Sequence, residues 1–318
     1  MACAPSPPSL EGVFFLCGPT AAGKTQIALA AAEALGAEIV GADAFQVYQG
    51  LDTLSAKPSA EALRHVPHHL VGVVPLSESF HAGRYQKMAR AALADIRARG
   101  KPALVVGAAG LYLRALTRGL AELPPTPPPL RAELAALPLE ALVERLRARD
   151  PQAAACVDLQ NPRRVARALE ISLLTGQPFS HFRREWERET PYHGLLLTRP
   201  RPELYARIDE RAAALLEGEA LALAEVRTAL REERASGKPV SATARQMIGW
   251  RELCAHLEGR LSRCEAVDAI ARATRRYAKR QSTWFAREPA LTPLLWEMGM
   301  AAEAVLAQVL QHARRALG

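Results

Sequence analysis

The sequence predicts an α/β fold, a P-loop parallel sheet flanked by helices, with an all-α domain inserted into it. In the first part of the chain, short apolar segments alternate with helical ones, which is typical of a parallel sheet covered on both faces. One strand runs into a glycine-rich loop that opens a helix, and a proline run followed by a long helical stretch interrupts the alternation. These observations predict a discontinuous core of residues 10–120 and 191–317 and an inserted helical domain of residues 121–190.

The first predicted strand, Val13–Cys17, leads into a phosphate-binding loop. The loop has the spacing G-x-x-x-x-G-K-T and lies between a strand and a helix, the context that such a site needs. Its backbone N–H groups can surround an anion, and the helix N-terminus adds the positive end of its dipole. We expect Lys24 to place a charge on a bound polyphosphate and the Thr25 hydroxyl to bind Mg²⁺. The expected phosphate-binding residues are Gly18, Pro19, Thr20, Ala21, Ala22, Gly23, Lys24 and Thr25.

Two more predicted strands end in segments of functional interest. Glu38–Ala42 is followed by Asp43, and Pro102–Val106 is followed by the turn Gly107–Gly110. Ligands of parallel sheets bind beyond the carboxyl ends of the strands, so Thr25, Asp43 and this turn are expected to converge. Asp43 is a candidate general base or a water-mediated ligand of Mg²⁺. Its alternative role is to cap the turn that follows it.

The remaining elements are mostly helical. Five prolines in residues 124–129 form an extended segment that cannot continue a helix, and a strand returns at Gly194–Thr198. From Pro202 onward the chain is predicted to be mostly helical. Individual helices are predicted over residues 82–99, 139–149, 165–174 and 301–317.

A helix start in the insertion carries three arginines. Asn161 as N-cap and Pro162 at the first position begin the helix. Arg163, Arg164 and Arg167 follow in its first two turns, where cations oppose the helix dipole. The plain alternative is a solvated basic face, and the functional one is contact with a phosphate backbone. In the functional case, replacing all three is expected to leave the stability unchanged or slightly higher.

A second basic helical segment, residues 272–285, has aromatic residues among its cations. A surface helix packed through its aromatic side chains is one interpretation, and nucleic-acid binding is the other. The whole chain has 41 Lys and Arg against 33 Asp and Glu, a net charge of +8, which favours a polyanionic partner. Aromatic rings and arginine planes can also hold an unstacked base. Nucleic acid is therefore the expected macromolecular partner.

Composition excludes other classes of protein. A hydrophobic fraction of 49% is that of a globular protein, and the 5 cysteines form no CxxC pair, so reduced thiols are expected. The sequence has neither a signal peptide nor an apolar run long enough to span a membrane, and a cytoplasmic location is expected. His65, His68 and His69 have no further ligand nearby in sequence, so no zinc site is expected. No membrane contact and no obligate protein partner are inferred.

Taken together, these segments resemble the tRNA dimethylallyltransferase family. The matching segments run in the family's order along nearly the whole chain: Gly18–Thr25, Asp43–Tyr48, Pro67–Leu70, Gly110–Leu113, Asn161–Glu170, Leu204–Arg211, Ile248–Glu252 and Thr274–Trp284. The resemblance implies that the loop holds the pyrophosphate of dimethylallyl diphosphate with Mg²⁺. It also implies transfer of the dimethylallyl group to N6 of the adenosine 3′ to the anticodon, after this base has flipped out of the tRNA anticodon stem-loop.

The resemblance also assigns residues to roles. It implies Asp43 as general base, with Lys24 and Arg207 acting on the diphosphate. The implied tRNA-binding residues are Asp43, Ala44, Phe45, Gln46, Ala109, Arg163, Arg164, Val165, Ala166, Arg167, Gln246, Met247, Ile248, Gly249, Trp250 and Arg251. This chain departs from the family pattern in four places: Ala108 and Ala109 replace Gly and Thr in the turn, Ala44 replaces Ser, and Trp250 replaces Tyr.

Two other functions share the loop. A small-molecule or nucleotide kinase would bind ATP there, although the basic helices and the helical insertion disfavour it. A non-catalytic P-loop RNA-binding protein would leave Asp43 without a chemical role. The ligand, ATP or dimethylallyl diphosphate, and the effect of replacing Asp43 distinguish these three functions.

Overall fold

The computed structural model describes residues 10–120, 123, 125–185, 190–217 and 221–318. The chain divides into two compact units, residues 118–189 and residues 8–117 with 190–318, which are described separately here. The expected domain boundary at residue 121 and the first proline of the run, Pro124, lie outside the described residues.

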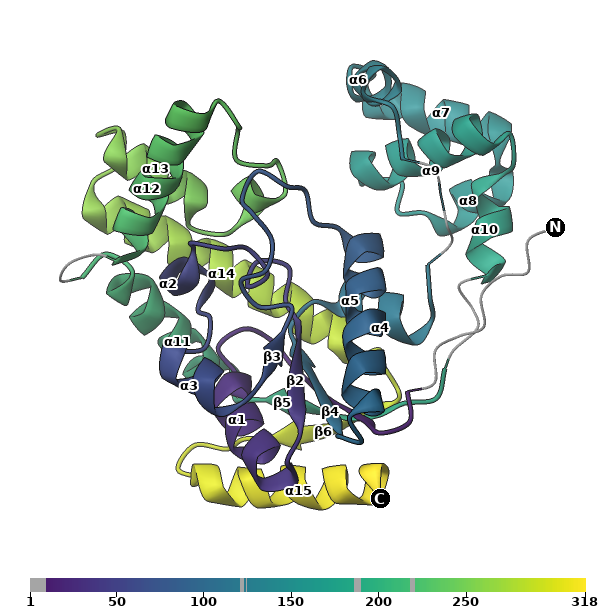
Figure 1. The fold of residues 1–318 in the computed structure, drawn as a ribbon. Helices are drawn as coiled ribbons and strands as arrows, with labels where there is room; N and C mark the ends of the chain where they lie inside the picture. Colours follow the sequence, from purple (N-terminus) through teal and green to yellow (C-terminus); the bar gives the residue numbers. More distant parts are fainter. Residues whose placement is uncertain (1–9, 121–122, 124, 186–189, 218–220) are drawn as a thin grey trace. The chain divides into compact units, whose positions relative to one another are not determined.

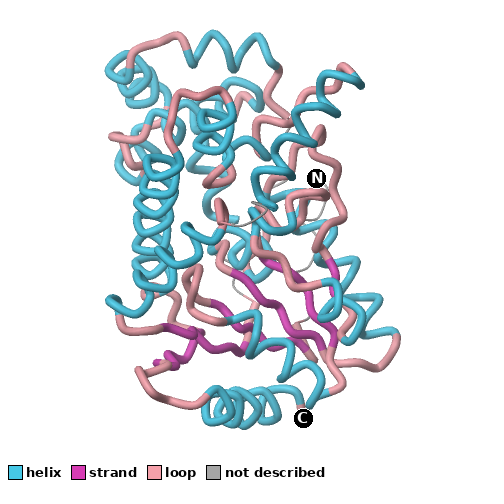
Figure 2. Tube along the Cα trace, turned by 90° about the vertical axis from the view of Figure 1, so that its left-hand side faces the viewer, coloured by secondary structure: helices cyan, strands magenta, loops and turns pink. Residues whose placement is uncertain are grey.

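The larger unit is built on a six-stranded sheet with the strand order β3-β2-β4-β1-β5-β6, in which every neighbouring pair is parallel (Figures 1 and 2). Helices cover both of its faces, which confirms the predicted fold class. The strands are β1 (Val13–Cys17), β2 (Glu38–Ala42), β3 (His68–His69), β4 (Ala103–Gly107), β5 (His193–Thr198) and β6 (Leu291–Leu295).

Alternation along β1 shows how the two faces are filled. Phe14 and Leu16 point to the face covered by α1 and α15, where they join one hydrophobic cluster. Phe15 and Cys17 belong to the cluster on the other face, which includes residues of α4, α5 and α12 to α14. Because both faces are buried, every residue of β1 is apolar.

The helices of the larger unit are α1 (Lys24–Leu35), α2 (Asp52–Ser55), α3 (Ala60–His65), α4 (Ala82–Ala98), α5 (Gly110–Thr117), α11 (Arg201–Ala214), α12 (Leu221–Ser236), α13 (Trp250–Leu257), α14 (Arg263–Phe285) and α15 (Ala302–Leu317), with a 3₁₀ turn at Ala244–Gln246. The predicted helices ending near Gly100 and near Leu317 correspond to α4 and α15. The longest helix, α14, starts with a capping box in which Ser262 and Glu265 bond each other's backbone N–H groups.

The sequence did not predict the two strands at the sheet edges. β3 is only two residues long, and its His69 hydrogen-bonds Glu38 through Nε2 at 2.7 Å. β6 contains Pro293 and has both buried and exposed residues, as an edge strand can. Among the described residues after 202, β6 is the one strand, and the other regular elements are helices. Among the described residues, no group of three or more His, Cys, Asp or Glu side chains is placed to hold a metal.

The smaller unit is helical in its described part. Its helices are α6 (Pro128–Ala135), α7 (Leu139–Arg149), α8 (Pro151–Cys156), α9 (Pro162–Thr175) and α10 (Phe179–Glu185). Their apolar side chains form a core of their own. The last two residues of the proline run open α6, where a proline is tolerated because its missing N–H has no partner in the helix.

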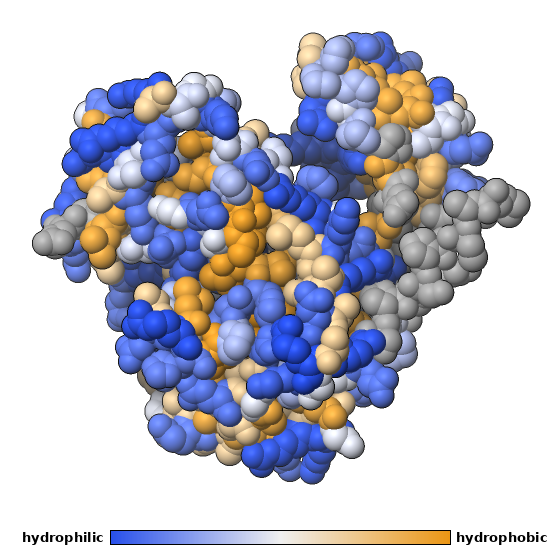
Figure 3. Space-filling model, in the orientation of Figure 1, coloured by the Kyte–Doolittle hydropathy of each residue, from blue (hydrophilic) through white to orange (hydrophobic). Residues whose placement is uncertain are grey.

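On the face drawn in Figure 3, hydrophilic residues surround apolar ones that gather toward the middle of the larger unit. No described helix is both long enough and apolar enough to cross a membrane.

Candidate functional site

The loop between β1 and α1 turns three of its carbonyl groups toward cationic side chains. The Lys24 Nζ donates to Pro19 O at 2.8 Å, the Arg207 Nε to Ala21 O at 3.0 Å and the Arg199 Nε to Ala22 O at 3.1 Å. Gly23, with φ at 95°, then opens α1, whose first N–H groups have no acceptor within the helix. The carbonyl groups of the loop thus accept hydrogen bonds from cations. The N–H groups at the start of α1 point away from the helix and can bind an anion.

The buried surroundings of this loop shift two pKa values. Burial lowers the pKa of Lys24 to about 8, against the opposing effect of the nearby Asp43 carboxylate. Burial raises the pKa of Cys17, at the end of β1, to about 12, so this thiol stays protonated near neutral pH. Lys24 is thus a charge whose desolvation an incoming anion would compensate.

Asp43 follows β2 and holds the next turn. Its Oδ1 accepts hydrogen bonds from Phe45 N at 2.9 Å and from Gln46 N at 3.3 Å, which is the capping role weighed above. Gln46 in turn donates to Ala56 O at 2.8 Å and so ties this turn to the end of α2. The other oxygen, Oδ2, accepts no hydrogen bond from a described residue. The carboxylate is therefore fixed in place by one oxygen and open to a ligand through the other.

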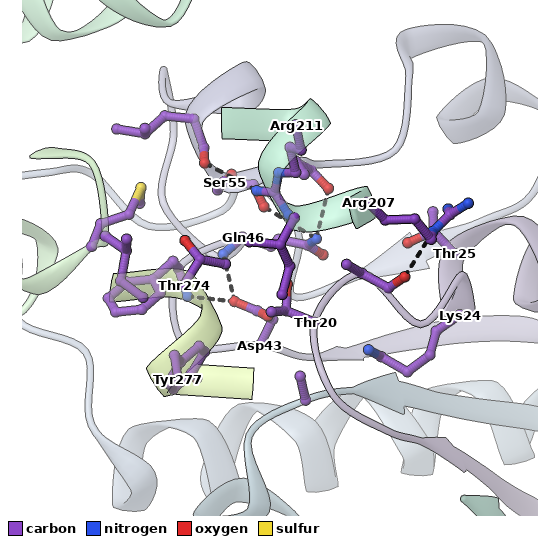
Figure 4. Close-up of a pocket in the computed structure, with 18 of the residues that line it drawn as sticks. Thr20, Lys24, Thr25, Asp43, Gln46, Ser55, Arg207, Arg211, Thr274 and Tyr277 are labelled. Atoms are coloured by element: carbon purple, nitrogen blue, oxygen red, sulfur yellow. Dashed lines mark hydrogen bonds between the residues drawn. The ribbon is translucent and has the colours of Figure 1, made fainter. Parts of the chain in front are cut away.

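The loop and Asp43 border one cavity of about 360 Å³ in the larger unit (Figure 4). Thr20, Lys24 and Thr25 reach it from the loop, Arg207 and Arg211 from α11, and Thr274 and Tyr277 from α14. Next to this polar end lies an apolar wall formed by Leu54, Ile208, Ala212, Leu215, Met247, Ile248 and Ile270. The cavity thus combines an anion site, a carboxylate and an apolar compartment.

Sequence reasoning missed five polar residues of this cavity: Gln26, Ser55, Arg211, Thr274 and Tyr277. Arg211 lies one helical turn beyond Arg207, and its Nη2 donates to Leu54 O at 3.3 Å. Burial lowers the pKa of Arg211, with Asp43 opposing that effect, and burial raises the pKa of Tyr277. The spacing of Thr274 and Tyr277 on one face of α14 was the only sequence signal, and it fitted simple packing equally well.

The structure brings part of the predicted site together. Asp43, Phe45, Gln46, Met247 and Ile248 line the cavity with the loop and Arg207. The remaining predicted residues of the larger unit do not line it, namely Gly18, Pro19, Ala22, Ala44, Ala109, Gln246, Gly249, Trp250 and Arg251. Trp250, also expected to contact tRNA, is 2% exposed and packs in the core of the larger unit.

The arginine helix of the smaller unit, α9, carries side chains with different surroundings. Arg163 is exposed and its side chain forms no hydrogen bond or ion pair with another described residue, whereas Arg164 lies 3.4 Å from the Asp158 carboxylate. The Nη1 of Arg167 donates to Thr126 Oγ1 at 2.7 Å and to the buried Glu170 carboxylate at 3.0 Å. Val165, also expected to contact tRNA, is fully buried in the core of this unit.

Arg167 therefore departs from the expectation that none of the three arginines supports folding. Arg167 is the nearer of two charged partners of the buried Glu170 carboxylate, at 3.0 Å, and Arg131 Nε lies at 3.9 Å, so removing Arg167 weakens an ion-pair cluster that the sequence did not reveal.

Comparisons with known proteins point to one family. A family model described as IPP transferase matches residues 46–288. The chain is 46% identical over 281 residues to a tRNA dimethylallyltransferase of Myxococcus xanthus, covering 86% of this chain and 89% of that protein. A crystal structure of a full-length tRNA isopentenylpyrophosphate transferase from Bacillus halodurans is similar with a TM-score of 0.66 and 32% identity, covering 95% and 98% of the two chains. A eukaryotic dimethylallyltransferase acting on tRNA is similar with a TM-score of 0.74 and 25% identity, covering 89% and 73%.

Proposed function

Since this chain belongs to the tRNA dimethylallyltransferase family, we propose that its cavity transfers a dimethylallyl group from dimethylallyl diphosphate to N6 of the adenosine 3′ to the anticodon in tRNA. The observation that carries this proposal is the cavity itself, where an anion-binding loop, a fixed carboxylate and an apolar wall lie side by side. An allylic diphosphate has a charged end and a short hydrocarbon end, which match these two compartments.

In this reaction N6 of the adenine attacks the allylic carbon that bears the diphosphate. The carbon–oxygen bond breaks, pyrophosphate leaves with both electrons, and the N6 proton passes to the free Oδ2 of Asp43. Charge grows on the departing pyrophosphate, where the loop amides, Lys24 and Arg207 stabilise it. Asp43 keeps its orientation throughout, because its Oδ1 is bonded to Phe45 N and Gln46 N.

Thr25 fits a Mg²⁺ site of the kind that uses few protein ligands. Thr25 is the second residue of α1, directly after Lys24, and it is exposed at the cavity beside the position expected for the diphosphate. Mg²⁺ typically keeps several waters and binds phosphate oxygens with one or two protein groups. The ion, held by Thr25 and the diphosphate, would neutralise part of the leaving group's charge.

Binding measurements with dimethylallyl diphosphate and with ATP, in the absence of an acceptor, test the donor site. Dimethylallyl diphosphate should bind more tightly than ATP in the presence of Mg²⁺, because the wall beyond the loop is apolar. Lys24→Ala should weaken binding of the diphosphate by removing a charge that touches it. Tighter binding of ATP, with transfer of its phosphoryl group to a small acceptor, would support the kinase function instead.

The lowered pKa of Lys24 predicts how donor affinity depends on pH. Below a pH of about 8 the amine is protonated and contributes to binding, and above it the charged fraction falls about tenfold per pH unit. The Kd for pyrophosphate should therefore rise by up to about tenfold per unit above pH 8, relative to Lys24→Ala. Comparing the two proteins by calorimetry from pH 7 to pH 9.5 cancels the ionisation of the ligand. A constant ratio between the two Kd values would contradict this prediction.

We propose that the smaller unit binds the anticodon stem-loop through the exposed part of α9. The support is the excess of cations near the start of this helix, where the helix dipole disfavours them. RNA phosphates are the anions that the family's substrate supplies.

Two single variants separate the roles of the arginines in α9. Arg163→Gln should change the free energy of unfolding by less than about 0.5 kcal/mol, because this side chain is exposed. Arg167→Gln should lower it by about 1–3 kcal/mol, because Glu170 loses its nearer charged partner and retains only the weaker contact with Arg131 Nε at 3.9 Å. Each variant should weaken tRNA binding and reduce its salt dependence by up to about 0.7–0.9 log units per lost phosphate contact. Equal melting temperatures of the two variants would contradict the structural role of Arg167. An unchanged salt dependence of tRNA binding in both variants would mean that α9 does not face RNA.

A further inference from the structure

One face of α14 is turned to the cavity and to the loops around it. Thr274, Tyr277 and Gln281 are spaced by three and four residues, so they lie along this face. Thr274 and Tyr277 line the cavity (Figure 4). Gln281, one turn further on, does not line it and is only 5% exposed.

The Gln281 amide connects two loops that are distant in sequence. Its Oε1 accepts a hydrogen bond from Thr20 N at 2.9 Å, in the phosphate-binding loop. Its Nε2 donates to Ala108 O at 2.8 Å, in the turn after β4. A primary amide offers an acceptor and a donor on adjacent atoms, and both are used here.

Each bonded group lies next to a part of the proposed reaction. Thr20 directly follows Pro19, whose carbonyl accepts from Lys24 Nζ. Ala108 directly precedes Ala109, whose N–H donates at 3.1 Å to Ala42 O, the last carbonyl before Asp43. Gln281 therefore stands between the residues that hold the diphosphate and the strand end that carries the carboxylate.

The helix itself is held against these loops by other contacts. A Cβ at Gly110 would lie 2.3 Å from Trp284, so α5 and α14 pack closely at this point. Arg114 of α5 lies over the Trp284 ring at 4.7 Å and pairs with Glu288 at 2.7 Å. A change at Gln281 alone should consequently leave α14 docked, while it removes the link between the two loops and the contact of Gln281 with the Tyr277 side chain.

We infer that Gln281 is a positioning residue, which sets the distance between the diphosphate in the phosphate-binding loop and the acceptor adenine at Asp43. This inference rests on the proposed prenyl transfer. Gln281 does not line the cavity, so its contribution is to the geometry of the bound pair, where a displacement of about 1 Å can cost about 100-fold in rate.

Gln281→Met tests this inference, because methionine has a similar length and forms neither hydrogen bond. We expect the single-turnover rate constant, with both substrates saturating, to fall by about 10- to 100-fold. The Kd values for pyrophosphate and for tRNA should each stay within about threefold. A single-turnover rate constant does not depend on the fraction of folded enzyme, so a purely structural defect would change only the amplitude.

Two more variants complete the experiment. Ser282→Ala is the matched control and should keep the wild-type rate constant. Among the described residues, the Ser282 hydroxyl hydrogen-bonds Ala278 O of the same helix and no group of either loop. Gln281→Glu keeps an acceptor for Thr20 N but, when ionised, has no donor for Ala108 O, so it should also be slow. It tests the link even if Gln281→Met fails to fold.

Three results would overturn the inference. A wild-type rate constant in Gln281→Met or Gln281→Glu would show that the link between the loops is not needed. Weaker pyrophosphate binding with an unchanged rate constant would make Gln281 part of the binding site only. Absence of prenyl transfer by the unmodified protein would overturn the proposed function, and this inference with it.

Discussion

Asp43→Asn should lower the turnover of prenyl transfer by about 10²–10⁴, the usual contribution of a general base, while tRNA affinity changes much less. The asparagine Oδ1 can still accept from Phe45 N and Gln46 N, so the turn that Asp43 holds stays in place. What the variant loses is a basic oxygen able to take up the N6 proton. Turnover measured under saturating conditions, together with tRNA binding, provides the test.

Asp43→Ala is the informative companion variant, because it removes the base and the cap of the turn together. We expect its turnover to resemble that of Asp43→Asn and its melting temperature to be lower. If both variants lose affinity and turnover equally, Asp43 is a binding residue and not the base. If Asp43→Asn transfers the dimethylallyl group as fast as the unmodified protein, Asp43 is not the base. If the unmodified protein binds tRNA but transfers no dimethylallyl group, the non-catalytic RNA-binding function would be favoured.

Removal of the smaller unit should abolish tRNA binding and leave pyrophosphate binding intact. The chain ends that the deletion must join lie side by side, because Thr190 N donates to Thr117 O at 2.8 Å. A short glycine–serine link in place of residues 119–189 should therefore not strain the larger unit. The anion site, Asp43 and the apolar wall all belong to the part that remains.

The control for this deletion is the larger unit's own stability and its affinity for pyrophosphate, each compared with those of the full chain. A retained melting transition and a Kd for pyrophosphate within about threefold would show that the core is folded. A folded deletion variant that binds tRNA as the full chain does would contradict the role proposed for the insertion.

Local patterns predicted the elements whose sequence requirements are strict. β1 and β4 are apolar throughout and β2 and β5 are apolar except at their ends, because both faces of the sheet are buried. The glycine spacing of the loop is that of an anion-binding turn. β3 and β6 escaped prediction, since edge strands can be short and can hold a proline.

The site was predictable only where a motif carried it. The loop, Asp43 and Arg207 belong to segments with a recognisable pattern, and they line the cavity. Arg211 and Gln281 also lie in matching segments, but the pattern of their helices does not say which face meets the sheet edge. That choice depends on packing, such as the contact between Gly110 and Trp284, which brings together residues far apart in the sequence.

The most direct test of prenyl transfer to tRNA is an analysis of the product nucleosides. The protein is incubated with dimethylallyl diphosphate, Mg²⁺ and unmodified bulk tRNA, and the tRNA is digested and examined by mass spectrometry. The account predicts adenosine carrying a dimethylallyl group at N6, formed by the unmodified protein and nearly absent with Asp43→Asn. Unmodified tRNA, together with ATP-dependent phosphorylation of a small acceptor by the same protein, would contradict it.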